Sequence, residues 1–263
     1  MSDNPEEHVM TFWEHLEELR GRMVRMILAF IVGGGTAWYF KGELLSLLTK
    51  PYVESWNAGE HQGGATLNFK APADAFMAYV KLSATAGAIF ALPIVLYQVW
   101  AFVAPGLYSR EKRLAIPFVI SSCGLFAGGG YFGWKFAFPK AFGFLLGFSG
   151  KLAGGITIVP TVMVSDYLDF VTHMLIAFGV AFELPVLAFF LSIAGIVDYK
   201  QLIKFFRYFV VVAFVISAVL TPPDPLSQLL LAIPLCGLYG VSILVAYFFG
   251  RKPLLPAEPP KEE

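Results

Sequence analysis

Three glutamates in this 263-residue sequence lie where a carboxylate calls for an explanation. Glu18 belongs to the amphipathic stretch Thr11–Met23, which predicts an interfacial helix that leads into the first span. Glu111 lies between basic residues in the segment Ala101–Arg113. Carboxylates bind guanidinium groups through paired hydrogen bonds and hold them better than ammonium groups. On one membrane face, Glu18 and Glu111 would bind a target with adjacent arginines beside an apolar stretch. The alternatives are a solvated acidic helix face for Glu18 and local ion pairing for Glu111.

Glu183 lies inside the apolar run AFGVAFELPVLAFF. An ionised carboxylate at the centre of a membrane helix costs about 2.5–3.5 kcal/mol, so we expect it to be neutral or paired. Pro185 cannot donate a hydrogen bond to the carbonyl of Ala181, which opens the helix locally. Glu183 is then a satisfied structural group, a proton or ion site, or a docking point for another transmembrane helix. Gln228 is a second polar candidate for bonding between helices.

The sequence gives little support for an enzyme. No metal-binding, serine-hydrolase or phosphate-loop motif occurs, and the four histidines lack metal-site spacing. Cys123 and Cys236 both lie inside apolar runs, which argues against a disulfide framework or a zinc site. Asp169 and His173 are four residues apart and favour a local hydrogen bond over a proton relay. We therefore expect no catalytic residues, no metal ion and no cofactor.

The composition indicates an integral membrane protein. Hydrophobic residues make up 57% of the chain and charged residues only 14%, whereas soluble domains average about 45–50% and about 25%. The mean hydropathy is +0.67. The formal net charge is zero, which argues against nucleic-acid binding through bulk positive charge. The acidic start MSDNPEEH argues against a cleavable secretory signal.

Six long apolar runs predict six transmembrane helices, because lipid cannot satisfy exposed backbone polar groups. A β-barrel is disfavoured because the runs do not alternate with period two. The expected spans cover residues about 22–40, 74–103, 114–138, 164–193, 205–220 and 226–249. The short link Thr221–Pro225 predicts an antiparallel hairpin of the last two spans. The segments about 41–73 and 139–163 are expected to be long outer loops.

The placement of lysine and arginine predicts that both termini are cytoplasmic, since the loops on the side of the termini are short and basic. Residues 1–250 then form a single polytopic membrane domain. The Pro-rich, charged tail 251–263 is expected to be disordered. The two halves of the chain differ in span and loop length, which weakens the case for an inverted-repeat transporter.

Four motifs make the sequence resemble the TatC family, the multispanning subunit of the twin-arginine protein translocase. They occur in the family's order at His15–Met23, Leu92–Arg113, Ala177–Val186 and Leu220–Pro234. The resemblance implies an all-α membrane protein of six transmembrane helices in a curved, glove-like bundle. It also implies a multi-pass protein of the bacterial inner membrane.

The resemblance implies a non-enzymatic receptor for protein export. With TatB, such a protein binds twin-arginine signal peptides, and it recruits TatA for export of folded proteins driven by the protonmotive force. The implied partners are TatB, TatA, other TatC copies, the signal peptides of folded cargo and the lipid bilayer. No nucleic acid, metal or cofactor is implied.

The family motifs also assign residues to roles. The positions that match the signal-peptide-binding region are Glu18, Glu111, Arg20 and Phe102. The positions that match contacts to partner helices are Glu183 and Gln228, and those that match structural or periplasmic positions are Pro51 and Asp224. One departure concerns the last span, where Gly240 stands in place of a common glutamate.

Three rival functions differ in what they predict. A small ion-coupled transporter with Glu183 as its proton site would take up solute in liposomes without partner subunits. A structural scaffold would keep export after Glu18 and Glu111 are replaced by alanine. An intramembrane protease is opposed by the lack of a serine–histidine or metal constellation.

Overall fold

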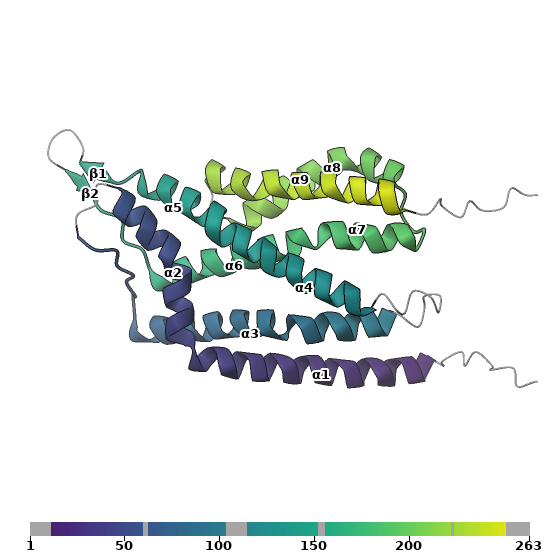
Figure 1. Ribbon diagram of the computed structural model, residues 1–263. Helices are drawn as coiled ribbons and strands as arrows, with labels where there is room; N and C mark the ends of the chain where they lie inside the picture. The colour runs from purple at the N-terminus through teal and green to yellow at the C-terminus, as the bar shows by residue number, and fades with distance from the viewer. Residues whose placement is uncertain (1–11, 60–62, 104–114, 152–155, 222–223, 251–263) are drawn as a thin grey trace, which may run out of the picture.

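The computed structural model describes residues 12–59, 63–103, 115–151, 156–221 and 224–250. Within these residues, most helices lie lengthwise in one elongated bundle, which confirms the all-α prediction (Figure 1). The helices in chain order are α1 (Phe12–Tyr39), α2 (Lys41–Ala58), α3 (Pro72–Val103), α4 (Ala115–Phe132), the π-helical segment η3 (Gly133–Ala137), α5 (Phe138–Leu146), α6 (Val164–Phe182), α7 (Leu184–Ile193), α8 (Tyr199–Leu220) and α9 (Pro225–Phe249).

Five helical stretches of the described chain are long and apolar enough to cross a membrane. They are Pro72–Val99, Ile116–Leu146, Val164–Ile193, Tyr199–Leu220 and Pro225–Phe249. A sixth is reached when α1 and α2 are taken together as one span bent by 77°. The structure therefore supports five or six spans, and the predicted six is the upper number.

The amphipathic stretch Thr11–Met23 is predicted as an interfacial helix that leads into the first span. In the structure its described residues form the first turns of α1, which continues unbroken to Tyr39. The continuity has a local cause, because α1 contains no proline, and its glycines, Gly21 and Gly33–Gly35, are tolerated inside a helix.

The segment about 41–73 is not the long loop that the sequence predicts, because it contains α2. The buried side chains of α2 are Leu48, Pro51, Tyr52 and Trp56, which recur at helical spacing and pack into the core. The turn between α1 and α2 points this buried face inward, and Pro51 is tolerated inside the helix. The loop prediction failed because α2 is only moderately apolar.

The third predicted span also ends later than expected. Instead of ending near residue 138, the helical path runs through η3 and α5 to Leu146. Pro139 lies in the first turn of α5, where its missing N–H is not needed. The chain then forms two antiparallel strands, β1 (Gly150–Lys151) and β2 (Thr157–Ile158).

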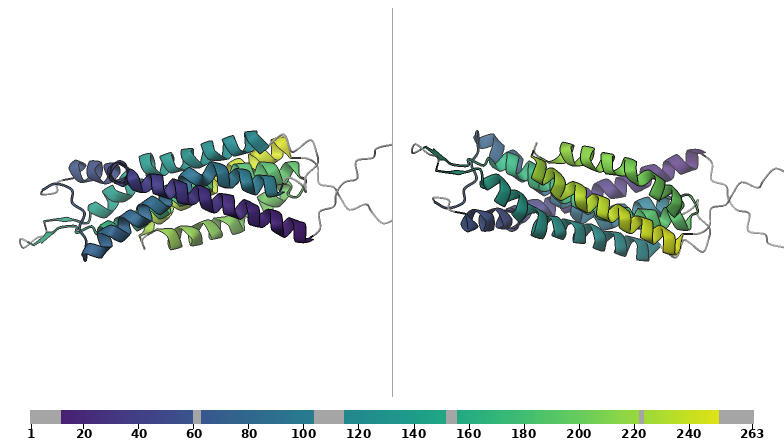
Figure 2. Two further views of the ribbon diagram at one scale, coloured as in Figure 1. Left: turned by 90° about the horizontal axis from the view of Figure 1, so that it is seen from below. Right: turned by 90° about the horizontal axis from the view of Figure 1, so that it is seen from above.

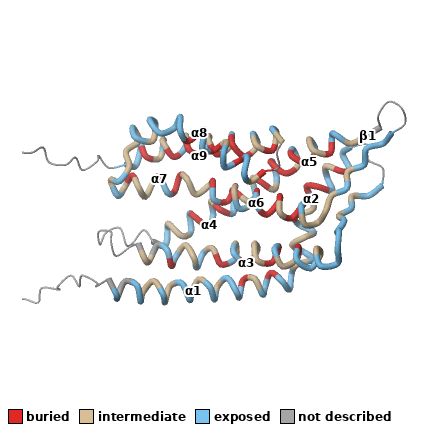
Figure 3. Tube along the Cα trace, turned by 180° about the vertical axis from the view of Figure 1, so that it is seen from behind, coloured by how far each residue is buried: buried red, intermediate tan, exposed pale blue. Residues whose placement is uncertain are grey.

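The core is an aromatic cluster where α2, α5 and α6 meet. Phe142 stacks on Tyr167 with ring centroids 5.4 Å apart, and Tyr52 meets Phe142 edge-on at 5.7 Å. The buried hydroxyl of Tyr167 donates a hydrogen bond to the carbonyl of Leu48 at 2.7 Å. Buried residues are sparse along most of α1, as Figure 3 shows. The buried core of the molecule therefore lies away from most of α1.

The bundle has two distinct ends and two edges. The start of α1 and the ends of α3, α7 and α9 lie at one end, whereas α2 and the β1–β2 hairpin lie at the other (Figure 1). The helices α1 and α3 run antiparallel at one edge, and α8 and α9 form the predicted antiparallel hairpin at the opposite edge (Figure 2). The first and last described residues therefore share one end.

Candidate functional site

Glu18 lies near the start of α1 and is paired with Arg22 one turn later. The Arg22 Nε donates to Oε1 of Glu18 at 3.0 Å. The same guanidinium donates to Oε1 of Gln98 at 3.2 Å and to the carbonyl of Ala101 at 3.0 Å, both on α3. Arg22 therefore orients the Glu18 carboxylate and ties the start of α1 to the end of α3.

Sequence reasoning missed Arg22 and Gln98 as parts of this site. The four-residue spacing of Glu18 and Arg22 is a signal for a helical ion pair and could have suggested the first contact. The contacts to α3 depend on how the two helices pack, and Gln98 is almost fully buried there. Buried amides are normally hydrogen-bonded, and Gln98 accepts its bond from Arg22.

A polar pocket of about 390 Å³ opens beside Glu18. Its described lining comes from α1 alone: Glu17, Glu18, Gly21, Arg22 and Arg25. The two carboxylates and two guanidinium groups that line this pocket could form ion pairs with a charged ligand.

The other candidates of this region are distributed as follows. Arg20 is exposed on α1, and Phe102 is partly buried in the last turn of α3, directly after Ala101. Because Arg22 bonds to Ala101, the structure brings Glu18 and the Phe102 region together. Glu111 lies outside the described residues.

Glu183 stands at a break between α6 and α7. Its backbone N–H donates to the carbonyl of Val180 at 3.1 Å, in place of a regular helical bond, and Pro185 occupies the first turn of α7. This confirms that the proline opens the helix. The Glu183 carboxylate lies beside Ser122 of α4. Among the described residues, its Oε1 and the Ser122 hydroxyl are buried without a hydrogen-bond partner.

Gln228 and Asp224 hold the α8–α9 hairpin. The Gln228 side-chain amide donates to the carbonyl of Phe214 on α8 at 3.2 Å, which confirms the predicted bond between helices. Asp224 caps α9, since its Oδ1 accepts from the backbone N–H of Ser227 at 2.7 Å. Pro51 is fully buried in α2. These contacts within the fold account for the three side chains structurally.

An ion pair that sequence reasoning missed joins α3 to α6. The ammonium of Lys81 lies 2.8 Å and 3.0 Å from the two carboxylate oxygens of Asp169. The ring of His173 donates to the backbone carbonyl of Asp169, at 2.6 Å between Nδ1 and the oxygen, so the predicted local bond forms with the main chain. The signal was present, because opposite charges in two apolar spans tend to pair.

The regions around Glu18 and Glu183 both offer polar groups for binding a ligand or a partner. In the described part of the chain, no group of three or more His, Cys, Asp or Glu side chains is placed to hold a metal ion. The site near Glu18 offers oriented charges at the bundle end, and Glu183 offers a polar group between apolar helices.

Comparison with known proteins relates most of the chain to one family. Residues 14–234 match the family described as Sec-independent protein translocase protein (TatC). The Desulforapulum autotrophicum protein of that name is 40% identical over 94% of this chain and 88% of its own length. The Aquifex aeolicus protein is 39% identical over 92% of this chain and 97% of its own.

Solved structures agree with the sequence relatives. A crystal structure titled "Twin Arginine Translocase Receptor- TatC" superimposes with a TM-score of 0.78 at 38% identity, covering 90% of this chain and all of the other. A second structure of that receptor in a detergent gives a TM-score of 0.77 at the same identity.

Proposed function

Because the chain belongs to the TatC family, and is thus a Sec-independent protein translocase component and not an enzyme, we propose that it is the subunit that binds twin-arginine signal peptides. The observation that carries this proposal is the Glu18 carboxylate, which Arg22 orients at the end of α3 beside a polar pocket. The related structure titled as a twin arginine translocase receptor supports the same role.

The mechanism begins when an arginine of the signal peptide binds the Glu18 carboxylate. A carboxylate has room for about four hydrogen bonds, so Glu18 can accept an arginine of the signal peptide while Arg22 keeps it oriented. Glu111 supplies the second carboxylate for the paired arginine. Arg20 and Phe102 border this region, and the apolar part of the peptide continues along the helices.

A crosslinking experiment tests the receptor role. A photoreactive residue at Phe102, in the full chain in its native membrane, is expected to crosslink a twin-arginine peptide. A matched peptide with two lysines is expected to crosslink at least about tenfold less, because lysine cannot form the bidentate pair. Equal crosslinking of both peptides contradicts the proposal.

Glu183 is the second part of the proposal, as the contact for a membrane helix of a partner subunit, TatB or TatA. The carboxylate and Ser122 are buried polar groups that a polar side chain of a partner could satisfy. Gln228, in the α8–α9 hairpin, is the second residue of the proposed contact with partner helices.

Replacing Glu183 with alanine is expected to lower co-purification of the partner subunits from membranes several-fold, since bonds between membrane helices contribute about 0.6–2 kcal/mol. The Glu183→Gln variant keeps a hydrogen-bonding group and is expected to retain most binding. Glu54→Ala, an exposed position on α2, is the matched control. If Glu183→Ala leaves partner recovery at the level of Glu54→Ala, Glu183 is not the contact.

The cellular arrangement follows from the same proposal. The protein is a multi-pass protein of the bacterial inner membrane, with a single domain over residues 1–250, a glove-like bundle and both termini cytoplasmic. It assembles with TatB, TatA and other TatC copies, and folded cargo crosses under the protonmotive force. Pro51, buried in α2, and Asp224, which caps α9, have structural roles at the periplasmic side and in the last hairpin.

A further inference from the structure

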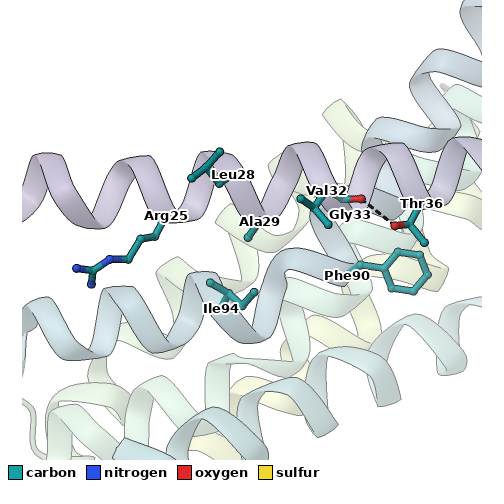
Figure 4. A pocket seen from close by; sticks show the side chains of 8 residues that line it. All are labelled: Arg25, Leu28, Ala29, Val32, Gly33, Thr36, Phe90 and Ile94. Carbon is teal, nitrogen blue, oxygen red and sulfur yellow. Dashed lines mark hydrogen bonds between the residues drawn. The ribbon is translucent and has the colours of Figure 1, made fainter.

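A groove of about 530 Å³ runs between α1 and α3, and only Arg25 is common to it and the pocket beside Glu18. Its lining residues are shown in Figure 4: Arg25, Leu28, Ala29, Val32, Gly33 and Thr36 from α1, and Phe90 and Ile94 from α3.

Small residues create this groove. Gly33 allows α1 to approach α3 so closely that an added Cβ would lie 2.8 Å from the carbonyl oxygen of Gly87. Ala29 leaves space one turn away. The hydroxyl of Thr36 donates to the carbonyl of Val32 at 2.9 Å, so this donor needs no hydrogen-bond partner from a ligand. The groove is therefore apolar along its length.

Arg25 is the exception and stands at one end of the groove. It is exposed, and within the described ranges it has no carboxylate at ion-pair distance, whereas Arg22 one turn earlier is paired with Glu18. Figure 4 shows its side chain extending from α1 toward α3 beyond the apolar stretch. Arginines near the ends of membrane helices extend their charge to the lipid headgroups.

The length of the groove fits one leaflet. The rise from Arg25 to Thr36 is about 16 Å at about 1.5 Å per residue, and half of a bilayer's hydrocarbon thickness is about 15 Å. We propose that this groove binds one anionic phospholipid, with its phosphate on Arg25 and an acyl chain along Val32 and Ile94.

The charge pattern favours a lipid over a helix of a partner protein. A guanidinium binds a phosphate through two parallel hydrogen bonds. One such group at the end of an otherwise apolar strip matches one headgroup and one chain. The proposal does not depend on the receptor function, because it needs only a chain embedded in a bilayer.

Lipid titration of the purified full chain tests the proposal. In native mass spectrometry, the wild-type chain is expected to bind phosphatidylglycerol about tenfold more tightly than phosphatidylcholine with the same acyl chains. Arg25→Gln is expected to remove this preference and leave phosphatidylcholine binding unchanged. Arg207→Gln, which removes an exposed guanidinium from α8, is the matched control and is expected to bind like wild type.

Two further variants keep the proposal falsifiable. Ala29→Phe fills the groove while keeping Arg25 and is expected to lower the affinity for both lipids. A photoreactive residue at Ile94 is expected to yield lipid adducts in native membranes. The proposal is wrong if Arg25→Gln keeps the preference for phosphatidylglycerol, if a folded Ala29→Phe chain binds lipid like wild type, or if Ile94 yields protein adducts only.

Discussion

Replacing both Glu18 and Glu111 with lysine is expected to abolish the export of twin-arginine cargo, because the variant would repel the paired arginines that the wild type attracts. Each neutral single variant, Glu18→Gln or Glu111→Gln, is expected to weaken peptide binding about tenfold or more, since a hydrogen bond to a charged group contributes about 1.5–3 kcal/mol. Export of a reporter and peptide crosslinking in native membranes measure the effect.

The contact between Glu18 and Arg22 complicates a simple reading of Glu18→Lys, because losing the pair also loosens the tie between α1 and α3. The Glu18→Gln variant separates the two effects, because its amide oxygen still accepts a hydrogen bond from Arg22 whereas the negative charge is lost. This variant is expected to unfold like wild type while binding peptide about tenfold less tightly. Wild-type peptide binding by Glu18→Gln, or normal export by the double lysine variant, contradicts the model of recognition.

The close crossing of α1 and α3 leads to the second large effect. Replacing Gly87 with alanine is expected to force the two helices apart, because its Cβ would lie 2.5 Å from the backbone nitrogen of Gly34. We expect a loss of about 1–3 kcal/mol of stability, and a strong loss of peptide binding, since α1 carries Glu18. Thermal unfolding of the purified chain measures the first effect.

The glycine triplet of α1 supplies matched controls. A Cβ on Gly33 would lie 2.8 Å from the Gly87 carbonyl oxygen, whereas a Cβ on Gly35 meets no described atom within 4 Å. Both changes to alanine favour the helix by up to about 1 kcal/mol, so propensity cancels between them. Gly33→Ala is expected to destabilise the protein and Gly35→Ala to leave it unchanged or more stable. Equal melting temperatures would show that the close approach is unimportant.

Features that depend on neighbouring residues in the chain were predictable from the sequence. The helix opens at Glu183 because Pro185 acts on its own turn, and Gln228 bonds across a hairpin that the prolines of the short link enforce. The apolar runs likewise identify the spanning helices, since their length reflects the thickness of the bilayer.

Features that depend on packing between distant segments were not predictable. The bonds from Arg22 to α3 and the pair of Lys81 with Asp169 require the relative positions of helices that the sequence does not contain. The third span was predicted to end too early, since the helical path continues past Pro139, which lies in the first turn of α5. The α2 helix was missed because it is only moderately apolar.

The edge position of α1 bears on how the protein can evolve. This helix is fastened by a glycine crossing and one arginine network, and its outward surface touches little of the remaining fold. Substitutions on that surface leave the aromatic core around Phe142 and Tyr167 undisturbed. Substitutions on the outward face of α1 can therefore change its contacts with lipids and partner proteins during evolution, while the packing of the other helices stays the same.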